Sequence, residues 1–374
     1  MMMRAGWGCR AVVAGAMVVV TLTGAASAQS AGDAGATLTP VAAFERDQVT
    51  GVAVTSGGRV FACMPLWHDG HRLHVVEVKP DGSYAAYPNA VWNSWNENVV
   101  ADTSQRFICV QSLRVDDRDR LWALDGAAPR MKGPVAGGAK LVELEPGYNR
   151  VKNVIRFNTE VAPEGSYLND VRIDSARGYA YVTDSGLGAI IVTNLNTNKS
   201  RRLLAEHEST KAEKDVVPVV NGIKLIRDGK PMRVHSDGIA LDARGEYLYW
   251  QALTGRTLYR IATEKLRDAN LTEEEVGAAV EKVGETVVTD GMEMDAAGNI
   301  YFTAIEQNAI VVRSPDGTMS TLAQDQRLVW PDTMAFGPGN ALYVTTSRIN
   351  ESEWFAAEGA RLQGPYGIWR MNRR

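Results

Sequence analysis

Polar side chains recur at one position in six repeated segments of this chain. Each segment joins an apolar alternating stretch, a tight turn and a second aromatic or β-branched stretch, which is the pattern of a β-hairpin. The residues that close the first stretch are Thr55, Asp116, Asp174, Asp242, Asp295 and Gly337. Five positions before each of them stands a polar residue, and these form the candidate ligand-binding set: Thr50, Gln111, Asn169, Asp237, Asp290 and Asp332.

The last four members of this set have the chemistry to hold a cation. Carboxylate and amide oxygens suit Ca²⁺ or Mg²⁺, and carboxylates in a partly desolvated cavity also attract a protonated amine. The alternative is that Asp and Asn only terminate loops here, because both residues favour turns. Their shared register in successive segments favours a common site.

The elements that must position these residues are hairpins, and their number predicts an all-β fold. Sheet-forming repeats of this length indicate a β-propeller, so six copies predict a six-bladed β-propeller. In a propeller the innermost strand of each blade runs along the central channel, which places the residue entering that strand at the channel mouth. The units run over 41–90, 91–157, 158–234, 235–284, 285–326 and 327–374.

No low-complexity linker separates the units, which predicts one domain over residues 41–374. The C-terminal segment YGIWRMNRR is expected to complete a blade beside the N-terminal strands. Such closure would remove free sheet edges, which otherwise invite aggregation.

Two insertions interrupt the repeat. The stretch LTEEEVGAAVEKV has Thr272 and Glu275 at capping-box spacing, which predicts a short helical insertion on the rim of blade four or five. The stretch 208–235 carries turn signals at Asn221-Gly222 and Asp228-Gly229. Long excursions in compact folds often cover a site, and the alternative is a surface hairpin without a role in binding.

Histidines offer two further candidates. His235 lies two residues before Asp237, so it is a candidate base or ligand contact, or else a hydrogen-bonding residue of the fold. The segment WHDGHRLHV brings His68, His71 and His74 close in sequence, which suggests zinc at first sight. Strand alternation and the Asp69-Gly70 turn would send the three imidazoles in different directions. We therefore interpret them as loop and surface histidines.

The N-terminal residues have the pattern of a secretory signal peptide. Arginines precede the apolar run 11–22, and Ala26-Ser27-Ala28 is a small-residue cleavage site, which predicts a signal over 1–28 and a secreted or periplasmic protein. The alternative is a retained membrane anchor. Residues 29–40 are expected to form a flexible leader, and no membrane contact is expected after cleavage. A formal net charge of −4 without a basic stripe argues against a nucleic-acid partner.

Two cysteines, Cys63 and Cys109, remain after the predicted cleavage. In an oxidising compartment they are a candidate disulfide between the first two blades. The alternative is a pair of buried thiols that act as small apolar residues.

Several runs of this chain resemble one family. The segments LWALDG, DSG, SDGIAL and DGMEMD occur in the order expected of the major royal jelly protein and Yellow family, in its bacterial branch, whose members are often named after dopachrome conversion. This resemblance covers nearly all of the chain after the signal. It implies a secreted six-bladed propeller whose central channel binds a small molecule, in some relatives an amine.

A more distant resemblance is to gluconolactonase and regucalcin propellers, which hold a divalent cation in the channel with Glu, Asn, Asn and Asp. Asn169 and Asp290 match two of these positions, Asp237 stands where the second Asn is expected, and Thr50 replaces the Glu. This resemblance implies a metal set of Asn169, Asp237 and Asp290 with Ca²⁺ as the cofactor.

Three hypotheses follow. The first is a propeller that binds a small molecule, an amine in particular, over Asn169, Asp237, Asp290 and Asp332. The second is a metal-dependent hydrolase of the lactonase type, in which the ion polarises a carbonyl and activates water. The third is an interaction protein with an inert channel, because a fold alone does not fix a function.

Overall fold

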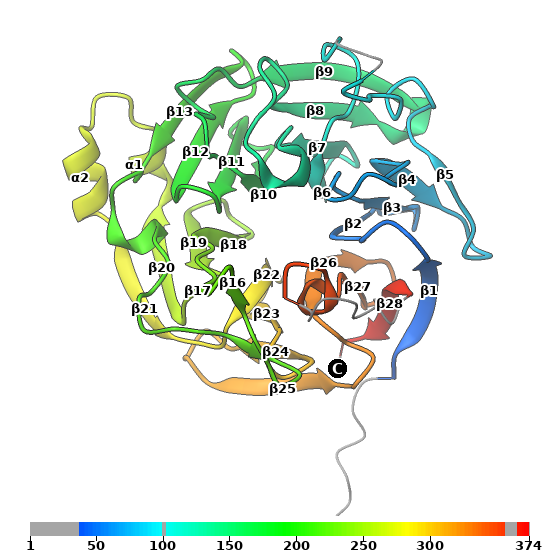
Figure 1. The fold of residues 1–374 in the computed structure, drawn as a ribbon. Helices are drawn as coiled ribbons and strands as arrows, with labels where there is room; N and C mark the ends of the chain where they lie inside the picture. Colours follow the sequence, from blue (N-terminus) through cyan, green and yellow to red (C-terminus); the bar gives the residue numbers. More distant parts are fainter. Residues whose placement is uncertain (1–36, 99–101, 356–364, 374) are drawn as a thin grey trace, which may run out of the picture. The chain divides into compact units, whose positions relative to one another are not determined.

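The computed structural model describes residues 37–98, 102–355 and 365–373. Within them the chain forms six four-stranded antiparallel sheets arranged around a centre (Figure 1). This confirms the predicted all-β, six-bladed propeller. The proposed signal over 1–28 and residues 29–36 of the expected leader lie outside the described residues.

The first three blades follow the chain without interruption. The first blade contains β2 (Gly51–Val54), β3 (Val60–Cys63), β4 (Val75–Val78) and β5 (Tyr84–Ala86). The second contains β6 (Val110–Val115), β7 (Leu121–Asp125), β8 (Lys140–Glu145) and β9 (Arg150–Arg156), and the third contains β10 (Leu168–Asp174), β11 (Tyr179–Asp184), β12 (Ala189–Asn194) and β13 (Lys199–Leu203).

The fourth blade contains β18 (Ser236–Leu241), β19 (Tyr247–Ala252), β20 (Thr257–Ala262) and β21 (Glu281–Glu285). The fifth contains β22 (Thr289–Met294), β23 (Ile300–Ala304), β24 (Ala309–Arg313) and β25 (Met319–Gln324).

The sixth blade joins the two ends of the domain. Its inner strands are β26 (Pro331–Gly337), β27 (Ala341–Thr346) and β28 (Tyr366–Asn372), and β1 (Thr39–Phe44) pairs with β28 as the outermost strand. The innermost strands contact one another in turn, and β26 contacts β2, so the ring is closed. The expected closure is confirmed, although β1 belongs to the last blade and not to the first. Because β1 begins at Thr39, the expected leader is already ordered there.

The Asp that recurs at the end of four of the six inner strands shapes the turn that follows it. Asp116 Oδ1 accepts hydrogen bonds from the backbone N–H groups of Arg118 and Arg120, at 2.9 and 3.0 Å. Asp295 does the same for Ala297 and Asn299. These Asx-type contacts explain why the motif recurs, since they hold the hairpin turn without help from another blade.

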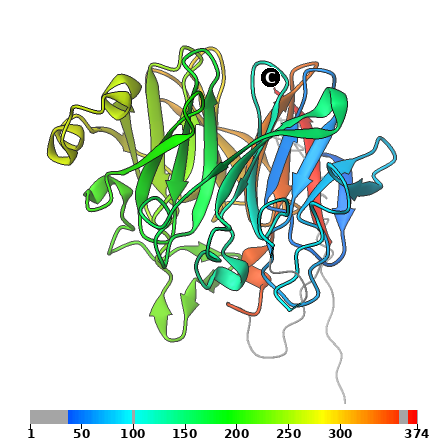
Figure 2. The same cartoon turned by 90° about the horizontal axis from the view of Figure 1, so that it is seen from above.

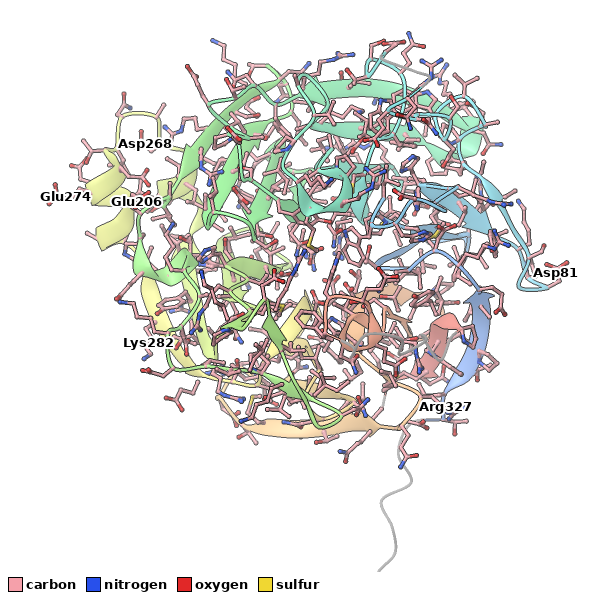
Figure 3. The ribbon with its side chains drawn as sticks, viewed as in Figure 1. Asp81, Glu206, Asp268, Glu274, Lys282 and Arg327 are labelled. Atoms are coloured by element: carbon pink, nitrogen blue, oxygen red, sulfur yellow. The ribbon has the colours of Figure 1, made fainter. Side chains whose placement is uncertain are left out.

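Apolar side chains fill the space between the blades. All five residues of β7 are buried, because this strand packs against the neighbouring blades through alternate side chains. Charged side chains such as Asp81, Glu274 and Arg327 are exposed at the outer rim (Figure 3). The centre of the ring is therefore where polar side chains need a specific explanation.

The helical elements are short and lie in the connections. They are α1 (Thr263–Arg267), α2 (Glu273–Ala278) and the 3₁₀ turns η1 (Pro129–Met131), η2 (Pro146–Tyr148), η3 (Glu208–Thr210) and η4 (Ile349–Glu351). α2 begins with the predicted capping box between Thr272 and Glu275, and Val276 packs beside blades three and four. Among the described residues no helix is long and apolar enough to cross a membrane.

The excursion before Asp237 forms two small hairpins, β14 (Val219–Val220) with β15 (Ile223–Lys224), and β16 (Ile226–Arg227) with β17 (Lys230–Pro231). Both predicted turns have positive φ angles, 49° and 80° at Asn221-Gly222 and 51° and 72° at Asp228-Gly229. Asn, Asp and Gly tolerate this backbone region, so the local sequence selects the turns. Figure 2 shows this segment, in green, extending from one face of the ring.

Candidate functional site

The inner strands are irregular at the positions where the candidate residues stand. The register of pairing with the second strand shifts between Val110 and Ser112 in β6, and the corresponding shifts in the other blades enclose Asn169, Asp237, Asp290 and Asp332. A β-bulge leaves a residue out of the ladder and redirects its side chain. The first blade has no such shift, because Gly51 to Val54 pair regularly with β3.

Two glycines let neighbouring bulges approach closely. A Cβ atom at Gly238 would lie 2.7 Å from the carbonyl oxygen of Asp290, and one at Gly291 would overlap the carbonyl oxygen of Asp332. A side chain at either position would push adjacent blades apart. In the Asp-Gly pairs of blades four and five, the Asp side chain therefore lines the cavity and the Gly allows the close contact between blades.

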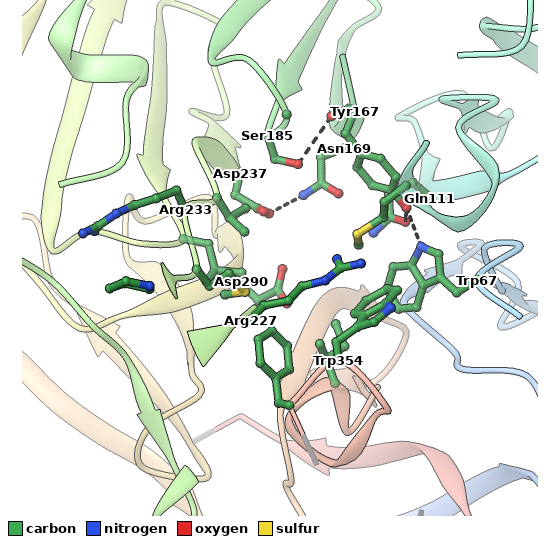
Figure 4. A pocket seen from close by; sticks show the side chains of 18 of the residues that line it. Trp67, Gln111, Tyr167, Asn169, Ser185, Arg227, Arg233, Asp237, Asp290 and Trp354 are labelled. Carbon is green, nitrogen blue, oxygen red and sulfur yellow. Dashed lines mark hydrogen bonds between the residues drawn. The ribbon is translucent and has the colours of Figure 1, made fainter. Parts of the chain in front are cut away.

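A cavity of about 570 Å³ opens at this end of the channel (Figure 4). Gln111, Asn169, Asp237 and Asp290 line it, so the structure brings four of the predicted residues to one space. Its volume falls in the range typical of sites for small ligands, roughly 300–1,000 Å³.

Aromatic residues make up much of the cavity wall. Trp67, Tyr167, Trp330 and Trp354 all line it. Trp67 Nε1 donates to the Tyr167 hydroxyl at 2.7 Å, and that hydroxyl donates to Gln111 Oε1 at 2.8 Å. The chain of hydrogen bonds fixes two rings and satisfies the buried amide oxygen. These aromatic residues lie outside the aligned hairpin positions, which is why the repeat does not reveal them.

Two carboxylates form the polar floor of the cavity. The side-chain amide of Asn169 donates to Asp237, and Trp330 Nε1 donates to Asp290 Oδ2 at 2.5 Å. Burial raises the pKa of Asp290 to about 7, with a further increase from the charge of Asp170. Burial and then the charge of Asp290 raise the pKa of Asp237 well above its ordinary value. The pair therefore favours either a shared proton or a bound cation.

Asp332 and Thr50 are close to the channel but do not line the cavity. Asp332 is buried, and its Oδ2 atom has no hydrogen-bond partner among the described residues. Burial, and then the charge of Asp290, raise its pKa well above the ordinary value. Thr50 is fully buried, its hydroxyl donates to the carbonyl oxygen of Gln111 at 3.0 Å, and its own carbonyl accepts from Thr345. Thr50 thus joins blades one, two and six.

His235 holds the excursion to the ring. Its Nδ1 atom accepts a hydrogen bond from the backbone N–H of Ala212 at 2.9 Å, and the backbone N–H of His235 donates to the carbonyl oxygen of Ser185. Burial and then the charge of Lys211 lower the pKa of this imidazole. His235 does not line the cavity, so the geometry gives it a positioning role for the segment that does.

The excursion forms the rim of the cavity on one side. Arg227, Met232, Arg233 and Val234 all line the cavity. The guanidinium of Arg227 lies 5.3 Å from the ring centre of Trp354, which is a cation–π contact (Figure 4). The sequence allowed two interpretations of this stretch, a cover for a site or a surface hairpin without a role in binding. Because part of the stretch lines the cavity, the geometry favours the first.

The expected disulfide is not formed, and Cys63 and Cys109 are both free and buried. The Cys63 thiol donates to the carbonyl oxygen of Gln111 at 3.3 Å and packs with Phe61. Cys109 belongs to a different apolar cluster, and burial raises the pKa of its thiol to about 12. The two thiols pack in different apolar clusters. The structure therefore fits the alternative prediction, in which both cysteines act as small apolar residues.

The histidines of the β3–β4 connection are not scattered over the surface. His71 and His74 have buried side chains, and the rings of His68 and His71 both approach Asp47. The prediction that strand alternation separates the three imidazoles was wrong, because residues 64–74 form a loop and not two strands.

The residues matched to the distant resemblance do not reproduce its four-residue calcium pattern. Thr50 donates its hydroxyl proton to Gln111, Asn169 turns its NH₂ group and not its oxygen toward Asp237, and one oxygen of Asp290 accepts from Trp330. Calcium needs six to eight oxygen ligands, so these contacts fit a shared proton or an organic cation better.

A closed ring of six four-stranded blades with an aromatic-walled, carboxylate-floored cavity at one channel end defines a propeller with a ligand-sized pocket. The chain belongs to the major royal jelly protein family, whose model matches residues 108–353. It is 23% identical to Protein yellow of Drosophila melanogaster in an alignment of 322 residues that covers 78% of this chain and 57% of the relative. Protein yellow of Drosophila erecta is 22% identical over the same shares. The chain thus spans little more than half the length of these relatives.

Solved structures with a similar fold come from several enzymes. A gluconolactonase from Xanthomonas campestris superposes with a TM-score of 0.54 at 13% identity, over 91% of this chain and 90% of the other. A luciferin-regenerating enzyme gives 0.53 at 10% identity, over 90% and 95%. At these identities the similarity shows the propeller fold alone.

Proposed function

We propose that this protein binds a small aromatic molecule with a protonated amine in the cavity at the channel mouth. The observation that carries the proposal is the buried Asp237–Asp290 pair at the floor of an aromatic-walled cavity. Among the described residues, the charges that act on this pair are those of other carboxylates, and no basic side chain is among them. A ligand ammonium group supplies the missing positive charge.

The aromatic part of the ligand is argued from the walls. Trp67, Tyr167 and Trp354 offer ring faces and edges, and such surfaces favour a planar apolar partner. Arg227 also lines the cavity, with its guanidinium beside the Trp354 ring (Figure 4). A molecule with its cation at the carboxylates and a neutral or acidic group at Arg227 would therefore suit this lining.

Calorimetric titration with matched ligands tests the proposal. Tyramine and 4-ethylphenol share a ring and differ in the amine, so the protein should bind tyramine and not the neutral analogue. Asp290→Asn should weaken tyramine binding, whereas Asp81→Asn, a change at an exposed turn, should not. Equal binding of the two ligands would contradict the role of the carboxylates.

The same titration with Ca²⁺ separates the other hypotheses. Calcium binding that Asp290→Asn abolishes would favour the hydrolase of the lactonase type over an amine pocket. If neither calcium nor any aromatic amine binds the wild-type chain, the channel is inert and the proposal fails.

We also propose that the protein is exported, on the signal-peptide pattern over residues 1–28. N-terminal sequencing of the protein recovered from the periplasmic and extracellular fractions tests this directly. Cleavage after Ala28 is expected. A cytoplasmic chain that retains Met1 would contradict export.

A further inference from the structure

Asp47, His68 and His71 bring three metal-ligating atoms together on the first blade. Asp47 Oδ1 lies 3.2 Å from His68 Nε2 and 3.2 Å from His71 Nδ1. All three atoms lie within 4.8 Å of one another. Asp47 precedes β2, and the two histidines belong to the β3–β4 loop, so the cluster joins segments that are distant in sequence.

The contacts in this cluster do not have hydrogen-bond geometry. The three facing atoms are buried, and none of them has a hydrogen-bond partner in the described part of the chain. An imidazole that simply donated to the carboxylate would direct its N–H at the oxygen. Here the nitrogens approach the oxygen without that alignment, as ligands do when they surround a common centre.

Two of the three ligand spacings are close to those of a tetrahedral metal ion, and the third, between the two imidazole nitrogens, is within 4.8 Å. Zinc binds imidazole nitrogen and carboxylate oxygen at about 2.0–2.2 Å, and tetrahedral geometry then separates two ligands by about 3.3–3.5 Å. The two distances of 3.2 Å from Asp47 are close to this range. A His, His and Asp set leaves a fourth position for water, and the His68 side chain, 38% exposed, gives solvent access to it.

An outer shell supports the buried ligand. His71 Nε2 lies 3.2 Å from His74 Nδ1, and the backbone N–H of His74 donates to Asn93 Oδ1 at 2.9 Å. A metal-binding imidazole usually donates its second ring N–H to an acceptor, which fixes the ring orientation, and His74 Nδ1 is placed to accept it here. His74 therefore keeps His71 Nδ1 directed toward Asp47.

We propose that Asp47, His68 and His71 form a site for a divalent first-row transition metal, with Zn²⁺ as the best fit. The site joins the segment before β2 to the β3–β4 loop, and Trp67, which lines the cavity, directly precedes His68. Metal binding would hold the backbone next to this tryptophan, whose ring already donates to Tyr167. His68 Nδ1 accepts the N–H of Gly70 at 3.1 Å. An imidazole that binds a metal through Nε2 carries its proton on Nδ1, so the exposed Asp69-Gly70 turn must release that contact when Nε2 binds the metal.

Metal titration of the folded, chelator-treated protein tests the site. One Zn²⁺ per chain should bind the wild type, and Co²⁺ should give the visible d–d bands of a tetrahedral ion. His68→Gln and Asp47→Asn should each weaken Zn²⁺ binding by more than about 100-fold, since removing a ligand costs more than removing an outer-shell partner. Circular dichroism should show that both variants keep the fold, because His68 is partly exposed.

Two matched variants locate the ion. His207→Gln changes a histidine outside the cluster, and Asp290→Asn changes the cavity floor, so both should bind Zn²⁺ as the wild type does. Loss of zinc in Asp290→Asn alone would move the ion to the channel and overturn the proposal. A folded wild type that binds neither Zn²⁺ nor Co²⁺ would also overturn it, and would leave Asp47 as an ordinary carboxylate partner of His68.

Discussion

Two layers of polar residues on the same inner strands behave in opposite ways. Gln111, Asn169 and Asp290 line the cavity, and three residues further along β6, β10 and β22 stand Arg114, Arg172 and Glu293. In the deeper layer Arg114 forms an ion pair with Glu293, and Arg172 lies 3.9 Å from the same carboxylate. The cavity layer has no such pairing.

The pKa shifts follow this difference. Burial acts to raise the pKa of Glu293, but the charges of Arg114 and Arg172 outweigh it and the net shift is downward. Burial raises the pKa of Asp290 with no guanidinium to oppose it. The deeper layer therefore supplies its own counter-charges and stabilises the ring, whereas under our proposal a ligand cation supplies the charge for the cavity layer.

Breaking the deeper layer should have the largest effect. Glu293→Gln removes the ion-pair partner of Arg114 and leaves the buried guanidinium of Arg172 with Asp170 as its remaining counter-charge. Loss of one partner of a buried pair costs about 3–5 kcal/mol of unfolding free energy. Urea denaturation of the variant and the wild type measures this. Asp290→Asn is the matched control. An equal loss of stability in the two variants would remove the distinction between the layers.

Changing the cavity layer should affect binding and not stability. Asp290→Asn removes a charge but keeps an oxygen that can accept from Trp330. Amine affinity should fall by about 1.5–3 kcal/mol, which is roughly 10- to 150-fold in Kd. Without ligand the variant should be at least as stable as the wild type at alkaline pH. A variant that binds tyramine with unchanged Kd would show that Asp290 does not contact the amine.

The pH dependence of stability should sharpen the same contrast. The pKa of Asp290 is raised from 3.8 to about 7 by folding, so the folded state holds a proton that the unfolded state has lost. Its stabilising contribution is therefore complete below about pH 4 and is lost as the pH rises to about 7. Thermal unfolding of the wild type should show this decline relative to Asp290→Asn. Parallel pH profiles of the two proteins would contradict the raised pKa.

The smallest effect concerns the rim. His235→Ala removes the acceptor for the backbone N–H of Ala212, and one such bond contributes about 1 kcal/mol. Limited proteolysis should then cut within residues 212–234 faster than in the wild type, and amine binding should weaken only slightly. His207→Ala serves as the control, because it lies before the segment that lines the cavity. Unchanged protease resistance would mean that other contacts hold the rim.

Much of this arrangement could be predicted from the repeat. The period of the hairpins identifies the blades, and the position five residues before each turn identifies Gln111, Asn169, Asp237 and Asp290, because local sequence determines both. The same rule includes Thr50, whose hydroxyl instead joins two blades, since the first strand has no bulge to redirect it. Register alone does not reveal such a difference.

Contacts between distant segments lay beyond the repeat. Trp67 reaches the cavity from an irregular loop, and Asp47 meets His71 through the same loop. This loop has no period from which side-chain directions follow. The free cysteines have a similar cause, because an even count says nothing about which packing cluster each thiol enters.

Proton release on amine binding tests the central claim most directly. A ligand ammonium that binds the Asp237–Asp290 pair must displace the proton that the raised pKa values hold there. Tyramine titrations near pH 7, in buffers with different ionisation enthalpies, measure this proton. We expect roughly half a proton or more released per bound amine in the wild type, because a group with a pKa near 7 is half protonated there, and much less in Asp290→Asn. Amine binding with no proton release in the wild type would contradict the account.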